Sequence, residues 1–296
     1  MAVRTFQARL LWLIVAVLAL LEAGTLVSVY FAGQRTLDKN VHDQLQVGAK
    51  IFDRTLQERA RQLAGNLRIL AKDFAFRELV ASGDVATMSS ALENQRKRVD
   101  AGAVLLVDLD GTVTADTLDG RLTRRPFPFP AMIADAQKKG EASATITFAN
   151  KPYQFVIVPV LAPQPIAWIC AGFEIDEKAL ADVRSLTSLD VSLWSSAAGL
   201  ISTLPPEERN DLLAQGPRTA TLRLGNAEYA TLVEALHTAD NSRVNVLLQR
   251  NLVEARKPFD RLILQIFALS FIMLAAAVVA AVIFSRSVSR PLRVLA

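Results

Sequence analysis

Long apolar stretches near each end of the chain dominate its hydrophobic pattern, at residues 10–32 and 262–284. At ~1.5 Å per residue, a helix over either stretch is roughly 35 Å long, more than the ~30 Å hydrocarbon core of a bilayer. The second stretch contains no charged residue, and the first contains one, Glu22. The pattern predicts two transmembrane helices that enclose a polar insert, residues 33–261.

A cleaved signal peptide is the alternative for the first stretch. Its apolar region is longer than the usual core of roughly 7–15 residues, and no A-x-A cleavage pattern follows it, so a retained helix is favoured. Basic residues without acidic neighbours flank the outer ends of both stretches (Arg4, Arg9, Arg286, Arg290 and Arg293). By the positive-inside bias, we expect both termini to be cytoplasmic and the insert to lie outside the cytoplasm.

A helical pattern follows the first apolar stretch, with small or apolar residues at alternating steps of three and four (Leu45, Ala49, Phe52, Leu56, Ala60, Leu63, Leu67, Leu70 and Phe74). No proline interrupts residues 34–79, which predicts one rod of about 45 residues and roughly 65 Å. Its stripe can pack on a sheet of the same chain, or near the membrane on the same helix of a second subunit. A parallel homodimer is the expected assembly. Asp84 is then a plausible N-cap for a second helix.

Alternating strand patterns and turn residues follow in two groups. The first comprises strands at 103–108 and 112–115, a loop at 121–130, a helix at 131–139, and strands at 142–148, 153–161 and 166–173. The second comprises a helix at 176–186, strands at 191–194 and 200–202, a helix at 205–215, and strands at 219–224, 228–236 and 244–249. We therefore expect an α+β fold with two PAS-like antiparallel sheets. Asn251 is a plausible N-cap for a final helix that runs past Pro258 into the second span.

Charge and cysteine content exclude several function classes. The net charge of +4 comes from the flanking arginines, because the insert holds 28 basic and 28 acidic residues of the chain's 33 and 29. A nucleic-acid surface needs clustered positive charge, so no nucleic-acid partner is expected. The single cysteine, Cys170, cannot form an intramolecular disulfide, and His42 and His237 have no partner at ligand spacing. No metal or other cofactor is predicted.

The order of these elements, followed by Ser289-Arg290-Pro291-Leu292-Arg293-Val294-Leu295, resembles the double-Cache class of bacterial transmembrane receptors, with the start of a HAMP module at the end. The resemblance implies seven parts in chain order. The membrane-side parts are a cytoplasmic N-terminus (1–9), the first span (10–32), the second span (262–284) and the truncated start of a HAMP module (285–296). Between the spans lie a long periplasmic helix with a second helix (33–100), a membrane-distal PAS-like unit (101–175) and a smaller membrane-proximal PAS-like unit (176–261). It also implies a two-pass protein of the bacterial inner membrane with a periplasmic sensor.

The same resemblance implies a signal-transduction receptor that relays the sensing of a small molecule to a cytoplasmic output domain. Such outputs are cyclic-di-GMP enzymes, histidine kinases or chemotaxis domains, and we favour the first. Residues expected to relay the signal are Glu22, Pro258, Pro291, Leu292 and Leu295. Pro291 presets the first turn of a HAMP helix, Leu292 and Leu295 begin its core stripe, and Glu22 is a costly carboxyl inside a span.

The segment Asp108-Leu109-Asp110-Gly111-Thr112 supports a different hypothesis, since D-x-D-G-T after an apolar strand is similar to the first motif of haloacid-dehalogenase-type phosphatases. Asp108 would be the nucleophile and Asp110 the acid/base, with Mg²⁺. No GDxxxD or Asp-Asp pair follows, and Asp and Gly here also suit a β-turn. The insert is therefore expected not to be an enzyme.

Candidate ligand-binding residues lie on the second helix, the proline-rich loop and the strands of the first unit (Arg96, Arg98, Arg121, Arg124, Arg125, Tyr153 and Trp168). Guanidinium groups suit a carboxylate, although basic runs are usually solvated and strand aromatics usually belong to the core. A periplasmic module that docks a partner protein is the second hypothesis. A collapsed pocket beneath residues 121–125, next to an exposed apolar patch, would favour it.

Overall fold

A computed structural model describes residues 2–118, 120–236, 238–239 and 243–289. The chain forms two compact units. One comprises residues 1–43 and 252–296, and the other comprises residues 44–251. Helix α1 (Ala2–Lys72) contributes to both units.

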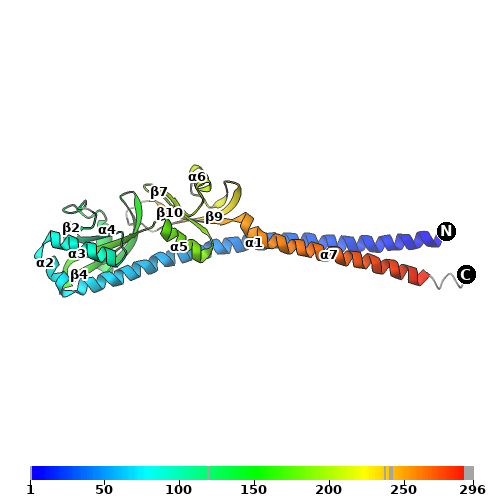
Figure 1. Cartoon of the computed structure of the whole chain (residues 1–296), viewed down its shortest axis with the longest axis horizontal. Coiled ribbons are helices and arrows are strands. Elements are labelled where there is room, and N and C mark those ends of the chain that lie inside the picture. The colour runs from blue at the N-terminus through cyan, green and yellow to red at the C-terminus, as the bar shows by residue number, and fades with distance from the viewer. Residues whose placement is uncertain (1, 119, 237, 240–242, 290–296) are drawn as a thin grey trace. The chain divides into compact units, whose positions relative to one another are not determined.

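The first unit pairs the N-terminal part of α1 with α7 (Leu252–Ser289), which contains Pro258 (Figure 1). Two of the described helices hold an apolar window long enough to cross a membrane, within Val15–Lys72 and Leu252–Ala280, with mean hydropathy 2.0 and 2.6. The helices touch at Gly33, where an added Cβ would lie 1.6 Å from Cζ of Phe259. Both predicted spans are therefore helical.

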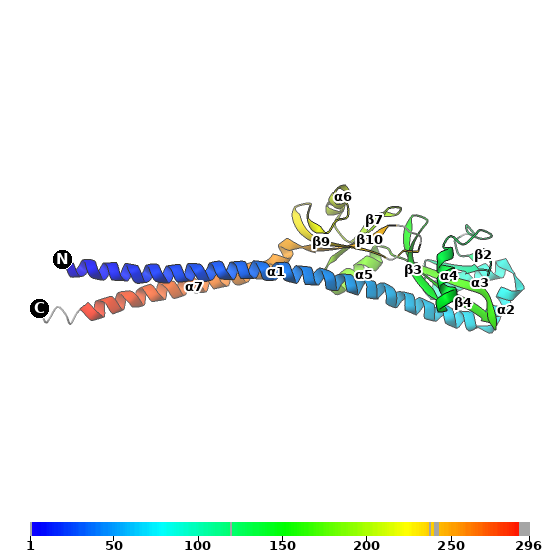
Figure 2. The ribbon, with the colours of Figure 1, turned by 180° about the vertical axis from the view of Figure 1, so that it is seen from behind.

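The second unit begins with the C-terminal part of α1, which runs along both sheets of this unit (Figures 1 and 2). Its predicted apolar stripe is buried in the core from Leu45 to Leu67. The rod ends at Lys72 and not near residue 79, because the Asp73 side chain accepts a hydrogen bond from Phe76 N and starts α2 (Phe74–Ser82). Phe74, the last predicted stripe residue, is therefore exposed. Asp84 caps α3 (Val85–Arg98) as expected.

The first sheet has the strand order β2-β1-β5-β4-β3 and is antiparallel throughout. Its strands are β1 (Ala103–Val107), β2 (Val113–Asp116), β3 (Ala142–Phe148), β4 (Lys151–Ala162) and β5 (Gln164–Glu174). Side chains alternate between its two faces. One face packs on α1, α2 and α3, and the other packs on α4 (Pro130–Lys139) and the preceding loop.

The second sheet repeats this layout with the order β7-β6-β10-β9-β8. After α5 (Glu177–Thr187) come β6 (Asp190–Ser195), β7 (Gly199–Ser202), α6 (Pro206–Gln215), β8 (Ala220–Leu224), β9 (Ala227–Ala235) and β10 (Val244–Asn251). On its α1 side, Gly48 is packed so closely that an added Cβ would lie 2.3 Å from Cδ1 of Leu189. The expected α+β fold with two antiparallel sheets is confirmed.

Candidate functional site

The predicted aromatic candidates both lie on the α4 face of the first sheet. Tyr153 and Trp168 are buried there in the apolar cluster that also contains Phe127 and Phe129 of the proline-rich loop. The Tyr153 and Phe155 rings meet edge to face with centroids 5.7 Å apart, and the Phe129 ring is tilted against Phe155 with centroids 6.4 Å apart. Apolar side chains thus fill this face. One polar atom stands out, since Trp168 Nε1 is buried without a hydrogen-bond partner among the described residues.

The loop arginines lie at the edge of that cluster, with Arg121, Arg124 and Arg125 exposed to solvent. Their loop is organised by the buried carboxylate of Asp116, which accepts hydrogen bonds from four backbone N–H groups and from the Thr123 hydroxyl at 2.7–3.0 Å. Burial of Asp116 raises its pKa, but the hydrogen bonds from Thr123 and the loop backbone outweigh this, and the pKa is lowered overall. Asp116 therefore fixes the loop that carries the arginines.

Arg96 and Arg98 lie elsewhere, at the C-terminal end of α3 on the opposite face of the first sheet. The Arg96 guanidinium pairs with Glu93 at 2.8 Å and donates to the Ala101 carbonyl at 3.3 Å. The Arg96 side-chain hydrogen bond, opposed by desolvation, lowers the pKa of Glu93 to about 2. The structure therefore places Tyr153 and Trp168 on one face of the first sheet, where Trp168 pairs with Pro159, six residues along β4 from Tyr153. Arg96 lies on the other face.

The aspartates of the D-x-D-G-T segment form a turn. Asp108 Oδ1 accepts from Thr112 N at 2.7 Å, and the Asp108 carbonyl accepts from Gly111 N, at which φ is +83°. Positive φ favours glycine, which explains the residue choice. Within the described part of the chain, three or more His, Cys, Asp or Glu side chains are nowhere grouped so as to hold a metal ion.

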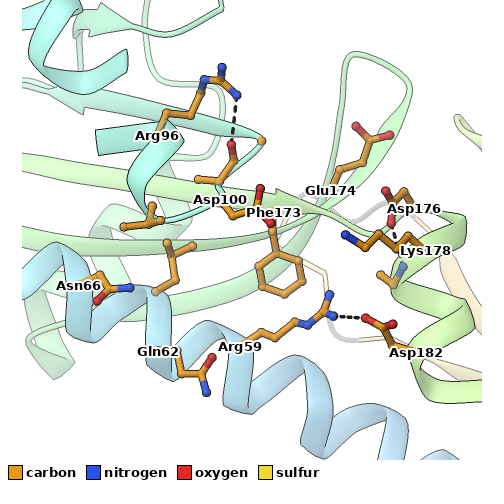
Figure 3. Close-up of a pocket in the computed structure, with 15 residues that line it drawn as sticks. Arg59, Gln62, Asn66, Arg96, Asp100, Phe173, Glu174, Asp176, Lys178 and Asp182 are labelled. Atoms are coloured by element: carbon orange, nitrogen blue, oxygen red, sulfur yellow. Dashed lines mark hydrogen bonds and ion pairs between the residues drawn. The ribbon is translucent and has the colours of Figure 1, made fainter. Parts of the chain in front are cut away.

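A polar cleft of about 540 Å³ opens on the α1 side of the first sheet (Figure 3). Its lining comes from α1, the end of α3 and the segment after it, the end of β5, and α5 with its N-cap (Arg59, Gln62, Asn66, Arg96, Asp100, Phe173, Glu174, Asp176, Lys178 and Asp182 among others). The Arg59 guanidinium pairs with Asp182 of α5 and lies 5.7 Å from the centroid of the Phe173 ring. This contact joins α1 to the helix that leads into the second sheet.

Several charged groups of the cleft are already engaged within the protein. Asp176 caps α5 by accepting from Ala179 N at 2.8 Å, and Glu174 pairs with Lys151 at 2.9 Å. The Glu174 hydrogen bond raises the pKa of Lys151. Other groups are not engaged: among the described residues, no hydrogen bond or ion pair involves the side chains lining the cleft at Gln62, Asn66, Asp100 and Lys178.

The cleft therefore offers one cation, one anion and two amides, with a guanidinium beside them. This set can bind both ends of a zwitterion, or a carboxylate alone. Of the residues that form it, sequence reasoning singled out Arg96 alone. Arg59 and Asp182 are 123 residues apart, and no sequence pattern signals their pairing.

Two of the predicted relay residues lie in the first unit. Glu22 is half-buried on α1, and Pro258 lies inside α7, next to the Phe259 ring that covers Gly33. Pro291, Leu292 and Leu295 lie outside the described residues.

Comparison with known proteins gives one family match, over residues 38–261, to the family described as "Double sensory domain of two-component sensor kinase" (dCache_3). No match was found among curated protein sequences. Among solved structures, the sensor domain of the histidine kinase DctB from V. cholerae has a TM-score of 0.47 at 16% identity, covering 73% of this chain and 98% of that one.

Two further solved structures show a similar level of likeness. The ligand-binding domain of the Pseudomonas fluorescens chemoreceptor CtaA, solved with L-isoleucine, has a TM-score of 0.45 at 13% identity, covering 76% of this chain and 96% of that one. A domain of a putative sensory box/GGDEF family protein from Vibrio parahaemolyticus has a TM-score of 0.45 at 9% identity, covering 76% of this chain and 99% of that one.

Proposed function

Since this chain belongs to the dCache_3 family of double sensory domains, we propose that it is a transmembrane receptor that binds a small zwitterion or carboxylate in the cleft beside α1. The family assigns residues 38–261 to the sensor part of a signalling receptor. This sensor region is not an enzyme. The identity of the ligand class and its site are our inference.

One observation carries this inference: the cleft holds side chains that no other described residue engages. Lys178 can pair with a ligand carboxylate, and Asp100 with an ammonium group. Asp100 has φ of +52°, an uncommon conformation for a residue other than glycine, which places a carboxyl-bearing turn at the cleft. The two amides of Gln62 and Asn66 supply further hydrogen bonds.

The same cleft suggests how binding alters the fold. Arg59 of α1 is held by Asp182 of α5, and a ligand carboxylate in the cleft competes for its guanidinium. A ligand shifts a conformational equilibrium only by its differential affinity for the two states. Replacement of Asp182 by the ligand carboxylate as the partner of Arg59 supplies such a difference in affinity. We propose that the resulting shift of α1 against α5 is relayed through the second span and HAMP helices, with Glu22, Pro258, Pro291, Leu292 and Leu295 on the route.

The wider assignment follows the element layout of the chain. We propose a two-pass protein of the bacterial inner membrane with a periplasmic sensor, cytoplasmic termini and a homodimeric assembly through α1 and the spans. For the output domain we favour an enzyme of cyclic-di-GMP metabolism over a histidine kinase or chemotaxis domain. This preference rests only on the resemblance to the double-Cache class of receptors.

The test is ligand binding by the full chain in lipid nanodiscs. Amino acids, organic acids and polyamines are added one at a time, and binding is measured by calorimetry and by thermal unfolding. We expect an amino acid or organic acid to raise the melting temperature. Lys178→Gln should weaken its binding about two- to fivefold, because an exposed charge pair is worth ~0.5–1 kcal/mol. Lys138→Gln, an exposed lysine of α4, is the matched control and should bind as the unmodified chain does.

A second candidate function, docking of a partner protein, is favoured by one observation. The α4 face beneath residues 121–125 is filled by apolar side chains, which is the collapsed pocket that this hypothesis predicts. Absence of any ligand effect across the panel would refute the cleft proposal and favour the docking module.

A further inference from the structure

The two sheets repeat the same strand order, so equivalent positions can be compared rung by rung. On β4 and β5, Phe155 pairs with Gly172, two residues along from Tyr153. On β9 and β10, Thr231 pairs with Gln249, two residues along from Tyr229. The two tyrosines thus occupy matching places, and the rung beside them is aromatic in the first sheet and polar in the second.

The aromatic rung is filled. A Cβ added at Gly172 would lie 2.5 Å from the Phe155 ring, so the ring rests directly on the glycine backbone. In the second sheet, the shorter side chain of Thr231 takes the place of Phe155. It lies on the face covered by α6, where Leu212, Tyr229 and Leu247 form the core.

A chain of hydrogen bonds ends at the amide oxygen of Gln249. Leu204 N donates to Ser202 Oγ at 3.0 Å, the hydroxyls of Ser202 and Ser192 are 2.6 Å apart, and Ser192 Oγ donates to Gln249 Oε1 at 3.1 Å. Because the amide oxygen is the acceptor at the end of this chain, both hydrogens of Gln249 Nε2 remain to be donated.

Neither polar atom of this rung finds a partner. Gln249 Nε2 and Thr231 Oγ1 are buried without a hydrogen bond among the described residues, and the two side chains are 0% and 3% exposed. A buried polar group left unsatisfied destabilises a protein, and such groups in native structures are usually met by ordered water or a ligand. Two adjacent ones on one rung indicate a shared guest.

The charges near the rung indicate that the guest is neutral. Glu208 accepts a hydrogen bond from the Tyr229 hydroxyl at 2.9 Å. Burial is the main cause that raises the pKa of Tyr229 to about 12, and this hydrogen bond is the second. The Arg209 guanidinium pairs with Glu177 at 2.9 Å and donates to the Ser202 carbonyl at 2.7 Å. Asp190 pairs with Gln249 on the β6 side of the same rung, and its carboxylate is held by Arg184 Nε at 3.2 Å and by the Thr203 hydroxyl at 3.4 Å. These charged groups therefore have partners within the protein, although Arg209 Nε is buried without one among the described residues. The unpartnered groups of the rung itself are an amide N–H and a hydroxyl.

We propose that the Thr231–Gln249 rung binds a small neutral guest through an oxygen atom that accepts from Gln249 Nε2 and shares a hydrogen bond with Thr231 Oγ1. Water and the carbonyl end of a small neutral solute have this chemistry. The site lies in the second sheet and uses no residue of the charged cleft, so it stands or falls independently of the proposed function.

The test uses the full chain in nanodiscs and the isosteric substitution Thr231→Val, which removes only the hydroxyl. With a guest present, losing its hydrogen bond should lower the melting temperature by about 2–6 °C. With no guest, the substitution removes an unsatisfied group and raises the melting temperature, which would overturn the proposal. Thr221→Val, at an exposed position of β8, is the matched control.

A second variant and a probe solute complete the design. Thr231→Ser keeps the hydroxyl and should melt close to the unmodified chain, whereas a Ser variant as destabilised as the Val variant would refute a role for the hydroxyl. Acetamide is the neutral carbonyl probe. If acetamide stabilises the unmodified chain and Thr231→Val abolishes this stabilisation, the guest is a solute. If Thr231→Val destabilises the chain and acetamide has no effect, the guest is bound water. Both outcomes support a bound guest.

Discussion

The substitution Asp116→Asn tests whether one carboxylate holds the proline-rich loop in place. Asp116 is 4% exposed, and its two oxygens accept five hydrogen bonds from residues 118–123. Asparagine has nearly the same shape but replaces one acceptor oxygen with an NH₂ group. That group would face N–H donors that Asp116 Oδ1 or Oδ2 now satisfies.

The magnitude follows from the number of donors that lose their acceptor. Oδ1 serves Leu118 N and Gly120 N, and Oδ2 serves Leu122 N and both donors of Thr123. Each unsatisfied buried donor costs ~1–3 kcal/mol, and the loop can turn some of them to water. We therefore expect a loss of about 2–4 kcal/mol, which corresponds to roughly 4–16 °C in melting temperature for a domain of this size.

The assay is thermal unfolding in nanodiscs at neutral pH, together with trypsin cleavage after Arg121 and Arg124. Cleavage should be slow in the unmodified chain and fast in the variant. Because the pKa of Asp116 is lowered on folding, its contribution is complete above the unfolded value of 3.8 and is lost as pH falls through the folded value. The gap between the two proteins should therefore close below about pH 4.

Asp110→Asn is the control, since this exposed aspartate is close in sequence and makes none of the hydrogen bonds described for Asp116. A change of less than about 0.5 kcal/mol for Asp116→Asn, equal to the control, would refute the argument that the carboxylate organises the loop.

Three other substitutions or reactions test separate parts of the structure. Gly65→Ala in α1 should raise the melting temperature by a few degrees, because an added Cβ meets nothing within 4 Å and alanine favours helix by ~1 kcal/mol; destabilisation would contradict this. Gly33→Leu should separate the two helices of the first unit by displacing Phe259, seen as a lower yield of engineered disulfides across them; an unchanged yield would exclude the contact. Cys170 is fully buried and burial raises its pKa, so maleimide labelling should occur only on unfolding, and rapid labelling of the native chain would count against the packing of β5.

The fold was largely readable from the sequence because its signals are local. Turn residues and alternating patterns marked each strand, and Asp84 capped its helix as predicted. The predicted end of the long helix was wrong. In the sequence, Asp73 resembles any polar residue on the solvent face of a helix, but in the structure its carboxylate accepts from Phe76 N and starts a new helix. A helix boundary set by a side-chain hydrogen bond leaves no gap in the apolar stripe.

The candidate site was harder to predict, because it depends on which face each element presents. Arg96 and Trp168 both belong to the unit of residues 44–251, but the first sheet lies between them. The cleft instead depends on Arg59 meeting Asp182, a contact between residues that are distant in sequence. The heptad pattern correctly predicted a packed stripe, and the homodimer remains a prediction for the part of α1 nearest the membrane.

The closeness of Gly48 to Leu248 has a consequence for the order of folding. An added Cβ at Gly48 would lie 3.0 Å from Leu248 Cδ2, so a residue made early in synthesis completes its packing against one made 200 positions later. Contacts of such long sequence separation are slow to form, because the intervening loop must close first. During synthesis, the face of α1 around Gly48 therefore stays partly uncovered until β10 emerges, and a chaperone that shields apolar helices has that whole interval in which to act.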